Sequence, residues 1–274
     1  MAAILVGAFG SLVGSFLNVV IFRVPAGFSV VFPPSRCPSC FARIRAFDNI
    51  PVVSWLVLRG KCRDCRVGIS IRYPLVELCT AGFFGVVALR FWSGDLISGS
   101  AAFTNALTAA LILIAYLYLA AVSVVLALID IDTRTLPNRI VLPSLLVGIV
   151  LLSAATLIGS DYSALLRAGI GSAALFLAYG MLAFASPGGM GLGDVKLAAV
   201  LGLYLGYLGW SQLVVGAFIA FLMGGLFGLT LMVFRRASRK TSIPFGPWML
   251  AGAWGGALVG VPIARGYLSL FGLA

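Results

Sequence analysis

The sequence predicts an all-helical integral membrane protein, a bundle of about eight transmembrane helices with one small metal-binding loop. Hydrophobic side chains make up 61% of the 274 residues, charged side chains make up 10%, and the mean hydropathy is +1.11. A soluble domain of this size cannot hide so much apolar surface. Uncharged runs recur along the chain, and several reach the ~20 residues that cross the ~30 Å hydrocarbon layer of a bilayer. A soluble globular protein is therefore excluded.

The sequence contains no histidine. This excludes Ser/His and Cys/His nucleophilic pairs, HExxH metal sites and histidine proton relays. Any catalysis must therefore rely on carboxylates or cysteines.

Eight apolar runs with few charges predict the membrane spans, at about 3–22, 74–91, 103–129, 141–159, 165–186, 194–209, 212–234 and 247–264. Sixteen of the 19 Lys and Arg residues fall on one side of this topology, and only Arg90, Arg167 and Arg265 fall on the other. This is the positive-inside pattern, so the long loop 23–73 is expected in the cytosol and both termini outside. Topology explains the net charge of +11, so we expect a lipid bilayer and no nucleic acid as partner.

Residues 1–22 form the first expected transmembrane helix. Positive charge follows this run at Arg23 instead of preceding it, so a cleaved signal peptide is not expected. Gly10 and Gly14 are four residues apart and predict close packing against another helix, as do Gly252 and Gly256 in the last span.

The loop 23–73 carries two CxxC motifs separated by 21 residues, formed by Cys37, Cys40, Cys62 and Cys65. Four thiolates suit a tetrahedral Zn²⁺ ion, and metal binding would supply the folding free energy of a loop too short to bury a core. Two disulfides or a redox-active CxxC are the alternatives. A cytosolic location argues against disulfides, and the pairing of the motifs argues against a redox site. Four thiolates leave no open position for water, so the zinc is expected to be structural.

Three acidic residues are expected at the cytosolic boundary of the membrane. Asp130 and Asp132 end the third span, and Asp194 begins the sixth. An acidic group at this depth is costly unless a function or a partner keeps it there. The glycine-rich segment 188–193 permits positive φ angles and the close approach of another chain, as a peptide substrate would require. The span 194–209 has 16 residues and covers only ~24 Å, so Asp194 is expected slightly below the membrane surface.

Two carboxylates at one site can hydrolyse a peptide bond without a nucleophilic side chain. One, ionised, takes a proton from water while the other, protonated, polarises the scissile carbonyl. A helix N-terminus favours the anion of Asp194 and a helix C-terminus disfavours that of Asp130. We therefore expect Asp194 to act as the base and Asp130 as the acid, with Asp132 as the fallback for Asp130.

Several ordered motifs point to one family. They are Gly14–Ile21 with Arg23–Pro25, the cysteine loop with Asp48–Pro51 and Leu58–Cys62, Ile71–Leu78, Asp130–Pro137, Gly191–Lys196 and Ile243–Pro247. Together they resemble the type IV prepilin peptidases, which are bifunctional leader peptidases and N-methyltransferases of the GxGD membrane aspartic protease class.

The resemblance implies an enzyme of the bacterial inner membrane with its active site facing the cytosol. It implies cleavage of prepilins or pseudopilins after glycine and methylation of the new N-terminus by S-adenosylmethionine. The catalytic aspartate of the first motif corresponds to Asp130, seven residues before Pro137. Gly191, Gly193 and Lys196 fall on the substrate loop.

Gly60 and Glu77 are the residues that we select for methyl-donor binding, although no sequence feature identifies that pocket by itself. For Glu77, an interfacial side chain paired with Arg72 is the simpler alternative.

The expected domain order is a first helix at 1–22, a zinc-binding loop at 23–73 and a membrane peptidase core at 74–274. An ion-coupled transporter is the competing class, but transport sites cluster at the bilayer midplane and often lie across inverted repeats. Here the acids lie at one edge and no repeat is visible. A peptidase without methyltransferase activity is a further alternative. The sequence identifies neither the oligomeric state nor the particular prepilins.

Overall fold

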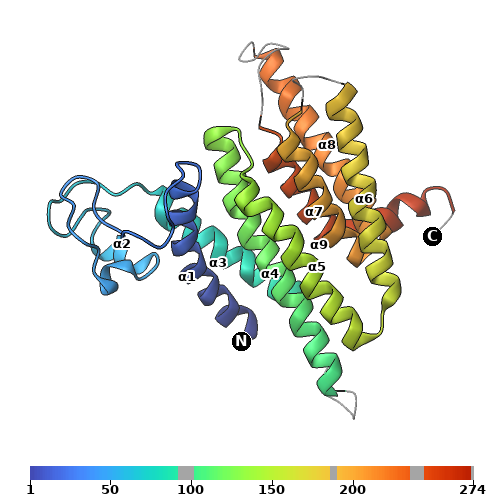
Figure 1. Ribbon diagram of the computed structural model, residues 1–274, viewed down its shortest axis with the longest axis horizontal. Helices are drawn as coiled ribbons and strands as arrows, with labels where there is room; N and C mark the ends of the chain where they lie inside the picture. The colour runs from blue at the N-terminus through green and yellow to red at the C-terminus, as the bar shows by residue number, and fades with distance from the viewer. Residues whose placement is uncertain (92–101, 186–189, 235–243, 273–274) are drawn as a thin grey trace. The chain divides into compact units, whose positions relative to one another are not determined.

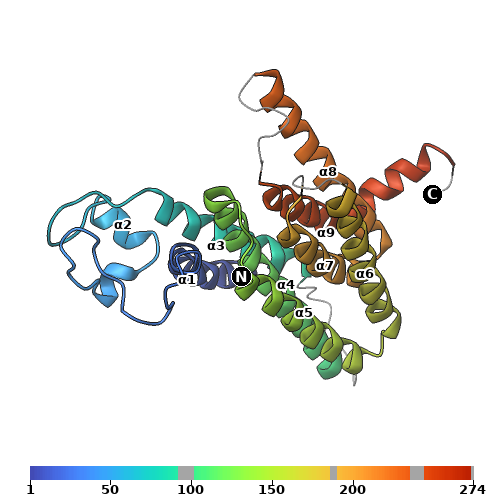
Figure 2. The same cartoon turned by 45° about the horizontal axis from the view of Figure 1, so that its top comes forward.

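The computed structural model describes residues 1–91, 102–185, 190–234 and 244–272 (Figures 1 and 2). Within these ranges regular structure is helical, and strand pairing is limited to two isolated bridges in the cysteine loop. The chain forms two compact units. The first unit comprises Met1–Ser93 and Leu117–Val125, and the second unit comprises Gly94–Tyr116 and Leu126–Ala274. The predicted helical class is confirmed, whereas the predicted domain boundaries at 22 and 73 remain expectations.

The first unit is built on two closely packed helices, α1 (Ala2–Arg23) and α3 (Arg72–Phe91). A Cβ atom at Gly10 would lie 2.7 Å from Cβ of Phe84, and one at Gly14 would lie 2.8 Å from Cα of Glu77. The predicted packing role of these two glycines is therefore confirmed. Between the helices, the cysteine loop contains a short 3₁₀ helix, η1 (Ala46–Asn49), and one α-helical turn, α2 (Val53–Val57).

The second unit is a helical bundle. Its helices are α5 (Asn138–Gly159), α6 (Tyr162–Ala185), α7 (Leu192–Leu208), α8 (Trp210–Val233) and α9 (Gly246–Ser269), together with both ends of α4 (Ala102–Thr133). Glycines bring neighbouring backbones together. For example, a Cβ atom at Gly252 in α9 would lie 2.5 Å from the backbone nitrogen of Ala220 in α8. Such contacts suit membrane helices, whose association depends on close packing.

Seven helices of the described residues are long and apolar enough to cross a membrane, namely α1, α3, α4, α5, α6, α8 and α9. The remaining predicted span, 194–209, is α7, which has 17 residues and a length of about 25 Å. From Leu197 to Tyr207 every residue of α7 is buried. Other helices therefore surround α7, and it does not qualify as a spanning helix by length.

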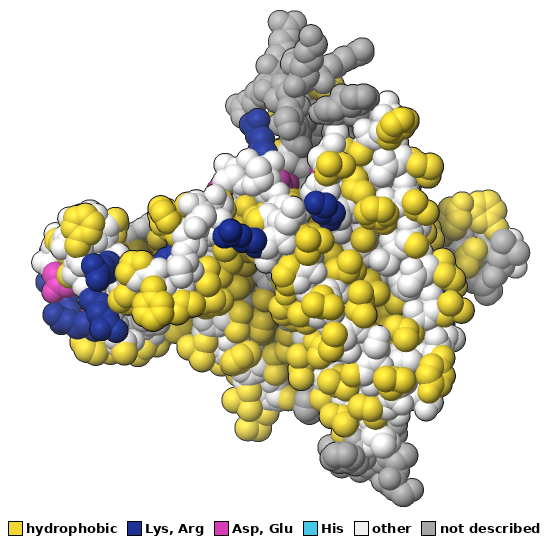
Figure 3. Space-filling view, viewed as in Figure 1, with side chains coloured by type: hydrophobic (Ala, Val, Ile, Leu, Met, Phe, Trp, Pro, Cys, Tyr) yellow, Lys and Arg dark blue, Asp and Glu magenta, His cyan; other side chains and the backbone are white. Residues whose placement is uncertain are grey.

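The outer faces of the bundle are hydrophobic. Figure 3 shows apolar side chains over much of the visible surface, and residues such as Leu146, Leu166 and Leu229 are at least 60% exposed. Contiguous apolar surface on this scale is typical of helices that contact lipid.

Candidate active site and metal site

Asp130 lies in the last turn of α4 and points into the second unit. Only 4% of Asp130 is exposed, whereas Asp132, two residues later, is exposed. Two residues correspond to about 200° of rotation around a helix, so the two carboxyl groups point in nearly opposite directions. The helix then ends at Arg134, which has a φ of 55° and whose N–H donates to the carbonyl oxygen of Asp130 at 2.8 Å.

The carboxyl group of Asp130 contacts the beginning of α9. Its Oδ2 accepts a hydrogen bond from the backbone N–H of Gly246 at 3.0 Å. A Cβ atom at position 246 would lie 2.8 Å from the same oxygen, so only glycine fits without displacement. The sequence motif 243–247 pointed to this segment but assigned no role to Gly246, and Ile243 lies outside the described residues.

Asp194 lies in the first turn of α7. Its Oδ2 accepts a hydrogen bond from the backbone N–H of Gly191 at 3.1 Å, which caps the helix. Gly191 has a φ of −80° and Gly193 is already helical, so neither glycine uses the positive φ angles that it permits. Gly188 and Gly189 lie outside the described residues. At Gly193 a Cβ atom would lie 3.0 Å from Cβ of Leu136, so this glycine allows close packing within the chain. The expected approach of another chain stays a prediction.

Three helix ends converge on Leu136, which follows the end of α4. Leu136 contacts Gly193 in the first turn of α7, and its Cδ2 would lie 3.4 Å from a Cβ atom at Gly246 in α9. The carboxyl groups of Asp130 and Asp194 are close enough to interact electrostatically. The structure therefore brings together two acidic residues that are 64 positions apart in the sequence.

Tyr179 of α6 is a neighbour of this pair that the sequence did not reveal. It is 2% exposed, lies within electrostatic range of Asp194, and its ring centroid is 6.3 Å from that of Phe245. A tyrosine in an apolar span carries no pattern that distinguishes it from a packing residue. Tyr179 therefore lines the buried side of the carboxyl pair.

The arrangement suits acid–base chemistry. Two neighbouring carboxyl groups do not both ionise readily, so one of them retains a proton while the other is an anion. Each carboxyl group accepts a backbone N–H at a helix start, Asp194 at α7 and Asp130 at α9. Both anions are therefore favoured by a helix N-terminus, and helix ends alone do not decide which residue holds the proton.

Lys196, one of the expected substrate-loop residues, extends from the first turns of α7 to the start of α5. Its Nζ donates to Oδ1 of Asn138 at 3.0 Å. This hydrogen bond connects α7 with α5. Lys196 follows Asp194 by two positions, so the two side chains leave α7 in nearly opposite directions.

The four predicted metal ligands form one cluster in the first unit. The Sγ atoms of Cys37, Cys40, Cys62 and Cys65 all lie within 4.8 Å of one another. Sγ of Cys37 and Sγ of Cys65 are 3.7 Å apart, and tetrahedral ligands with Zn–S bonds of ~2.3 Å have S–S separations of ~3.8 Å. The cluster can therefore hold one metal ion, and the spacing fits zinc.

The two CxxC motifs have the same backbone design. Cys37 N–H bonds to the carbonyl of Ala42, and Cys62 N–H bonds to that of Val67, five residues on in each case. Phe41 and Arg66, each four residues after the first cysteine, have φ angles of 58° and 61°. These turns direct both sulfur atoms of each motif to the same side.

The electrostatics of the cluster favour a cation. Backbone N–H groups of Cys40 and then Ser39 donate to the sulfur of Cys37 and lower the pKa of that thiol to about 6. The backbone N–H of Ala42 lowers the pKa of Cys40, but burial and the adjacent thiols outweigh it and raise this pKa to about 12. The first thiolate thus hinders the formation of others, and a divalent ion would relieve that repulsion.

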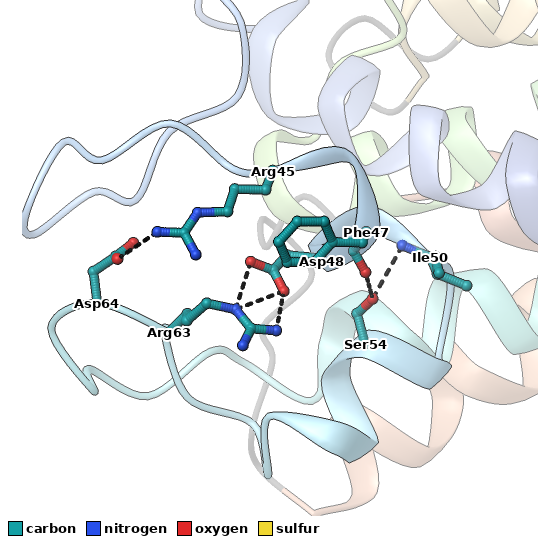
Figure 4. Close-up of polar contacts among 7 residues, drawn as sticks. All are labelled: Arg45, Phe47, Asp48, Ile50, Ser54, Arg63 and Asp64. Carbon is teal, nitrogen blue, oxygen red and sulfur yellow. Dashed lines mark hydrogen bonds and ion pairs between the residues drawn. The ribbon is translucent and has the colours of Figure 1, made fainter.

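Two ion pairs join the segment after the first motif to the second motif (Figure 4). Nε of Arg63 lies 3.0 and 2.9 Å from the two carboxylate oxygens of Asp48, and Nη2 lies 2.6 Å from Oδ1. Arg45 and Asp64 form a single contact of 3.3 Å. The guanidinium groups of Arg45 and Arg63 lie 6.0 and 5.2 Å from the centroid of the Phe47 ring. We call these five residues the charged clamp.

Gly60 and Glu77 have structural explanations. Gly60 has a φ of 67°, and a Cβ atom there would lie 2.9 Å from the Trp55 ring. Glu77 is 8% exposed, and its Oε2 accepts the N–H of Val52 at 2.7 Å, which ties the loop to α3. These contacts give both residues a structural role, and their selection for methyl-donor binding stays a prediction.

Comparisons with known proteins cover both units. A model described as the bacterial peptidase A24 N-terminal domain matches residues 8–91, and the type IV leader peptidase family matches residues 117–229. Three relatives are called prepilin leader peptidase/N-methyltransferase. The Stutzerimonas stutzeri protein is 36% identical, covering 94% of this chain and 91% of the relative. The Pseudomonas aeruginosa protein is 35% identical, covering 96% of this chain and 92% of the relative. The Neisseria gonorrhoeae protein is 36% identical, covering 91% of this chain and 88% of the relative. No solved structure matches.

Proposed function

This chain belongs to the type IV leader peptidase family, and we propose that it is a membrane-bound prepilin leader peptidase and N-methyltransferase. The observation that carries the peptidase assignment is that the buried Asp130 and the partly exposed Asp194 meet at three helix ends. The relatives' shared name supports both activities and the prepilin substrate class.

The carboxyl pair performs the hydrolysis. The ionised carboxylate removes a proton from a water molecule, whose oxygen attacks the scissile carbonyl carbon. The protonated partner donates a hydrogen bond to the carbonyl oxygen as its negative charge develops. The pair then returns a proton to the amine as the peptide C–N bond breaks. Gly246 and Gly191 hold the two carboxyl groups by backbone hydrogen bonds, which costs no reorganisation during the reaction.

The assignment is tested with purified protein and a membrane-inserted prepilin. Asp130→Asn and Asp194→Asn are each expected to reduce the cleavage rate by at least about a thousandfold, because neither single carboxyl group can supply both roles. Asp132→Asn is the matched control on the same helix turn and is expected to retain cleavage. Normal cleavage by either of the first two variants would reject the mechanism.

We further propose that the cysteine cluster holds a structural zinc ion through Cys37, Cys40, Cys62 and Cys65. The near-tetrahedral sulfur spacing and the filled set of four ligands support this identity. The ion would crosslink the two CxxC motifs and stabilise a loop that has little other core. Metal analysis of the purified protein tests this, with about one equivalent of zinc expected and a loss of bound zinc in Cys62→Ser.

The membrane location of this activity is the bacterial inner membrane, with the carboxyl pair on the cytosolic side. The asymmetric distribution of Lys and Arg supports this orientation. S-adenosylmethionine is the proposed methyl donor, and it would supply an electrophilic methyl group to the new N-terminal amine. Radiolabelled donor should mark the processed prepilin, while cleavage without label would identify a peptidase alone.

A further inference from the structure

The cysteine loop contains an uncharged run of nine residues, Ile50–Leu58, which includes the helical turn α2. We call this run the α2 segment. The loop around it is strongly basic, with nine Lys and Arg residues between positions 23 and 73. The large apolar side chains of the α2 segment are between 50% and 71% exposed at Ile50, Val53, Leu56 and Val57. A contiguous apolar patch of this kind indicates an interaction surface.

The polar groups of the α2 segment point toward the loop. The hydroxyl of Ser54 donates to the carbonyl oxygen of Phe47 at 2.8 Å and accepts the N–H of Ile50 at 3.1 Å (Figure 4). The indole N–H of Trp55 donates to the carbonyl oxygen of Ile69 at 3.1 Å. Ser54 is buried, so the side of α2 that faces away from the loop is left to apolar side chains.

Contacts within the first unit place the α2 segment at the depth of the membrane. Arg23 is the first charged residue of the chain and ends the spanning helix α1, so it marks where α1 leaves the hydrocarbon layer. Gly14 lies nine residues earlier, about 13 Å along the helix axis. Glu77 of α3 is level with Gly14, since a Cβ atom at Gly14 would lie 2.8 Å from its Cα. The N–H of Val52 donates to Oε2 of Glu77 at 2.7 Å. A glutamate side chain is shorter than the axial offset between Gly14 and Arg23, so Val52 lies on the membrane side of Arg23.

The surroundings of the α2 segment favour lipid as its partner. Figures 1 and 2 show α2 beside α1 and not beyond the end of α1. Leu75 and Leu78, on either side of Glu77 in α3, are also exposed and continue the apolar surface. Arg59 and Lys61 follow the α2 segment directly. Long basic side chains beside an apolar surface can reach anionic lipid headgroups while their stems remain among apolar groups.

We propose that the α2 segment inserts its exposed apolar side chains into the lipid leaflet on the side of the cysteine loop and anchors the loop there. The α2 segment is then an exception to the cytosolic location expected for residues 23–73. Cys62 follows Leu58 by four residues, so the anchor holds the metal cluster close to the headgroups. This inference does not depend on the proposed peptidase function.

A photoreactive residue at Val57 tests the lipid contact in full-length protein, reconstituted in nanodiscs of phosphatidylcholine and phosphatidylglycerol. Val57 is 71% exposed, so the probe displaces no neighbour. Irradiation should attach phospholipid to the peptide that contains residue 57, as identified by mass spectrometry. The matched control is the same probe at Phe41, which is 72% exposed and lies in a turn closed by the paired residues Arg36 and Arg43. The control should give at least tenfold fewer lipid adducts, because charged residues flank that turn.

A second arm places a charge in the α2 segment. Leu56→Asp should reduce lipid labelling at position 57 at least tenfold, because a carboxylate in the hydrocarbon layer is costly. Phe41→Asp is the control for the added charge and should leave that labelling unchanged. Both variants should retain hydrogen-exchange protection of the Cys62 amide, which bonds to the carbonyl oxygen of Val67 within the loop. Lost labelling with retained protection reports loss of lipid contact and not unfolding.

Three outcomes would overturn the anchor. Labelling at position 57 that is no greater than at position 41 would show that the α2 segment lies in water. Adducts with another part of the chain in place of lipid would show that the α2 segment packs against protein. Unchanged labelling in Leu56→Asp would show that the apolar side chains are not inserted. None of these measurements uses a prepilin, so their failure leaves the proposed function untouched.

Discussion

The active site requires glycine at position 246. A Cβ atom there would approach Oδ2 of Asp130 to 2.8 Å, so Gly246→Ala should push the carboxyl group away from Asp194. We expect the kcat for prepilin cleavage to fall roughly 10- to 100-fold, because small misplacements of catalytic groups have effects of this size. Cleavage kinetics at saturating substrate measure this.

The matched control for this substitution is Gly266→Ala, at a glycine of the same helix where an added Cβ atom would meet nothing within 4 Å. It should retain full activity, since alanine has the higher helix propensity and nothing is displaced. Equal activity of the two variants would contradict the role assigned to Gly246.

Asp48 is the second residue with a measurable individual role. The bidentate contact with Arg63 lowers the pKa of the Asp48 carboxyl. Its stabilising contribution is therefore complete above the unfolded pKa of ~3.9 and is lost as the pH falls through the lower folded value. Asp48→Asn should thus weaken protection of the loop amides near neutral pH, and wild type and variant should converge in strong acid. Hydrogen exchange of metal-free protein, compared at equal pH, measures the difference.

The sequence predicted the two catalytic aspartates but not the hydrogen bond from Gly246. It placed Asp130 and Asp194 at helix ends because acidic residues stand out in an apolar sequence. It did not separate Asp130 from Asp132 by pattern, since their difference in burial arises from the packing of α4. The hydrogen bond from Gly246 was beyond prediction, because a backbone N–H donor has no sequence identity and lies 116 positions from its acceptor.

At the scale of elements, the charged clamp positions the two cysteine motifs. Residues that support metal ligands typically alter metal affinity roughly 10- to 100-fold when they are replaced. We expect a decrease of this size in zinc affinity for Asp48→Asn, measured by competition with a chelator. Asp64→Asn should have a smaller effect, because its contact with Arg45 is single and both side chains are over 40% exposed. A larger effect of Asp64→Asn would contradict this ranking.

The pairing of α1 with α3 depends on glycine. Gly14→Leu would force a side chain against the backbone of Glu77, at a position where a Cβ atom alone would lie 2.8 Å from Cα. Overpacking of this kind costs about 1–3 kcal/mol, so the melting temperature in detergent should fall by several degrees. Gly82→Leu on α3 is the control, since nothing lies within 4 Å of that position. An unchanged melting temperature in Gly14→Leu would contradict the dependence of the α1–α3 contact on glycine.

The sequence predicted most elements for a simple reason. A spanning helix needs a long apolar run, and such runs are visible without knowledge of the fold. Helix α7 is the exception, because after Lys196 it carries no charge on any side and its burial among other helices cannot be read from periodicity.

For the whole molecule, the division into two units separates the metal site from the carboxyl pair. The cysteines belong to the first unit and the carboxyl pair belongs to the second. Chelation of the metal should therefore expose the loop 23–73 to proteolysis, while cleavage of a short peptide stays within about twofold of its initial rate. Limited proteolysis and peptide cleavage in the same sample measure both effects. A parallel loss of peptide cleavage would show that the loop supports the carboxyl pair directly.

The burial of α7 also has a consequence for how the enzyme depends on its host membrane. The helix that carries Asp194 is screened from lipid, so hydrophobic mismatch acts on its longer neighbours and reaches α7 only through them. Those neighbours can adapt to lipids of different acyl-chain length by tilting. Peptide turnover should accordingly remain nearly constant across a series of phosphatidylcholines of increasing chain length, which would let one enzyme work in membranes whose composition shifts with growth temperature.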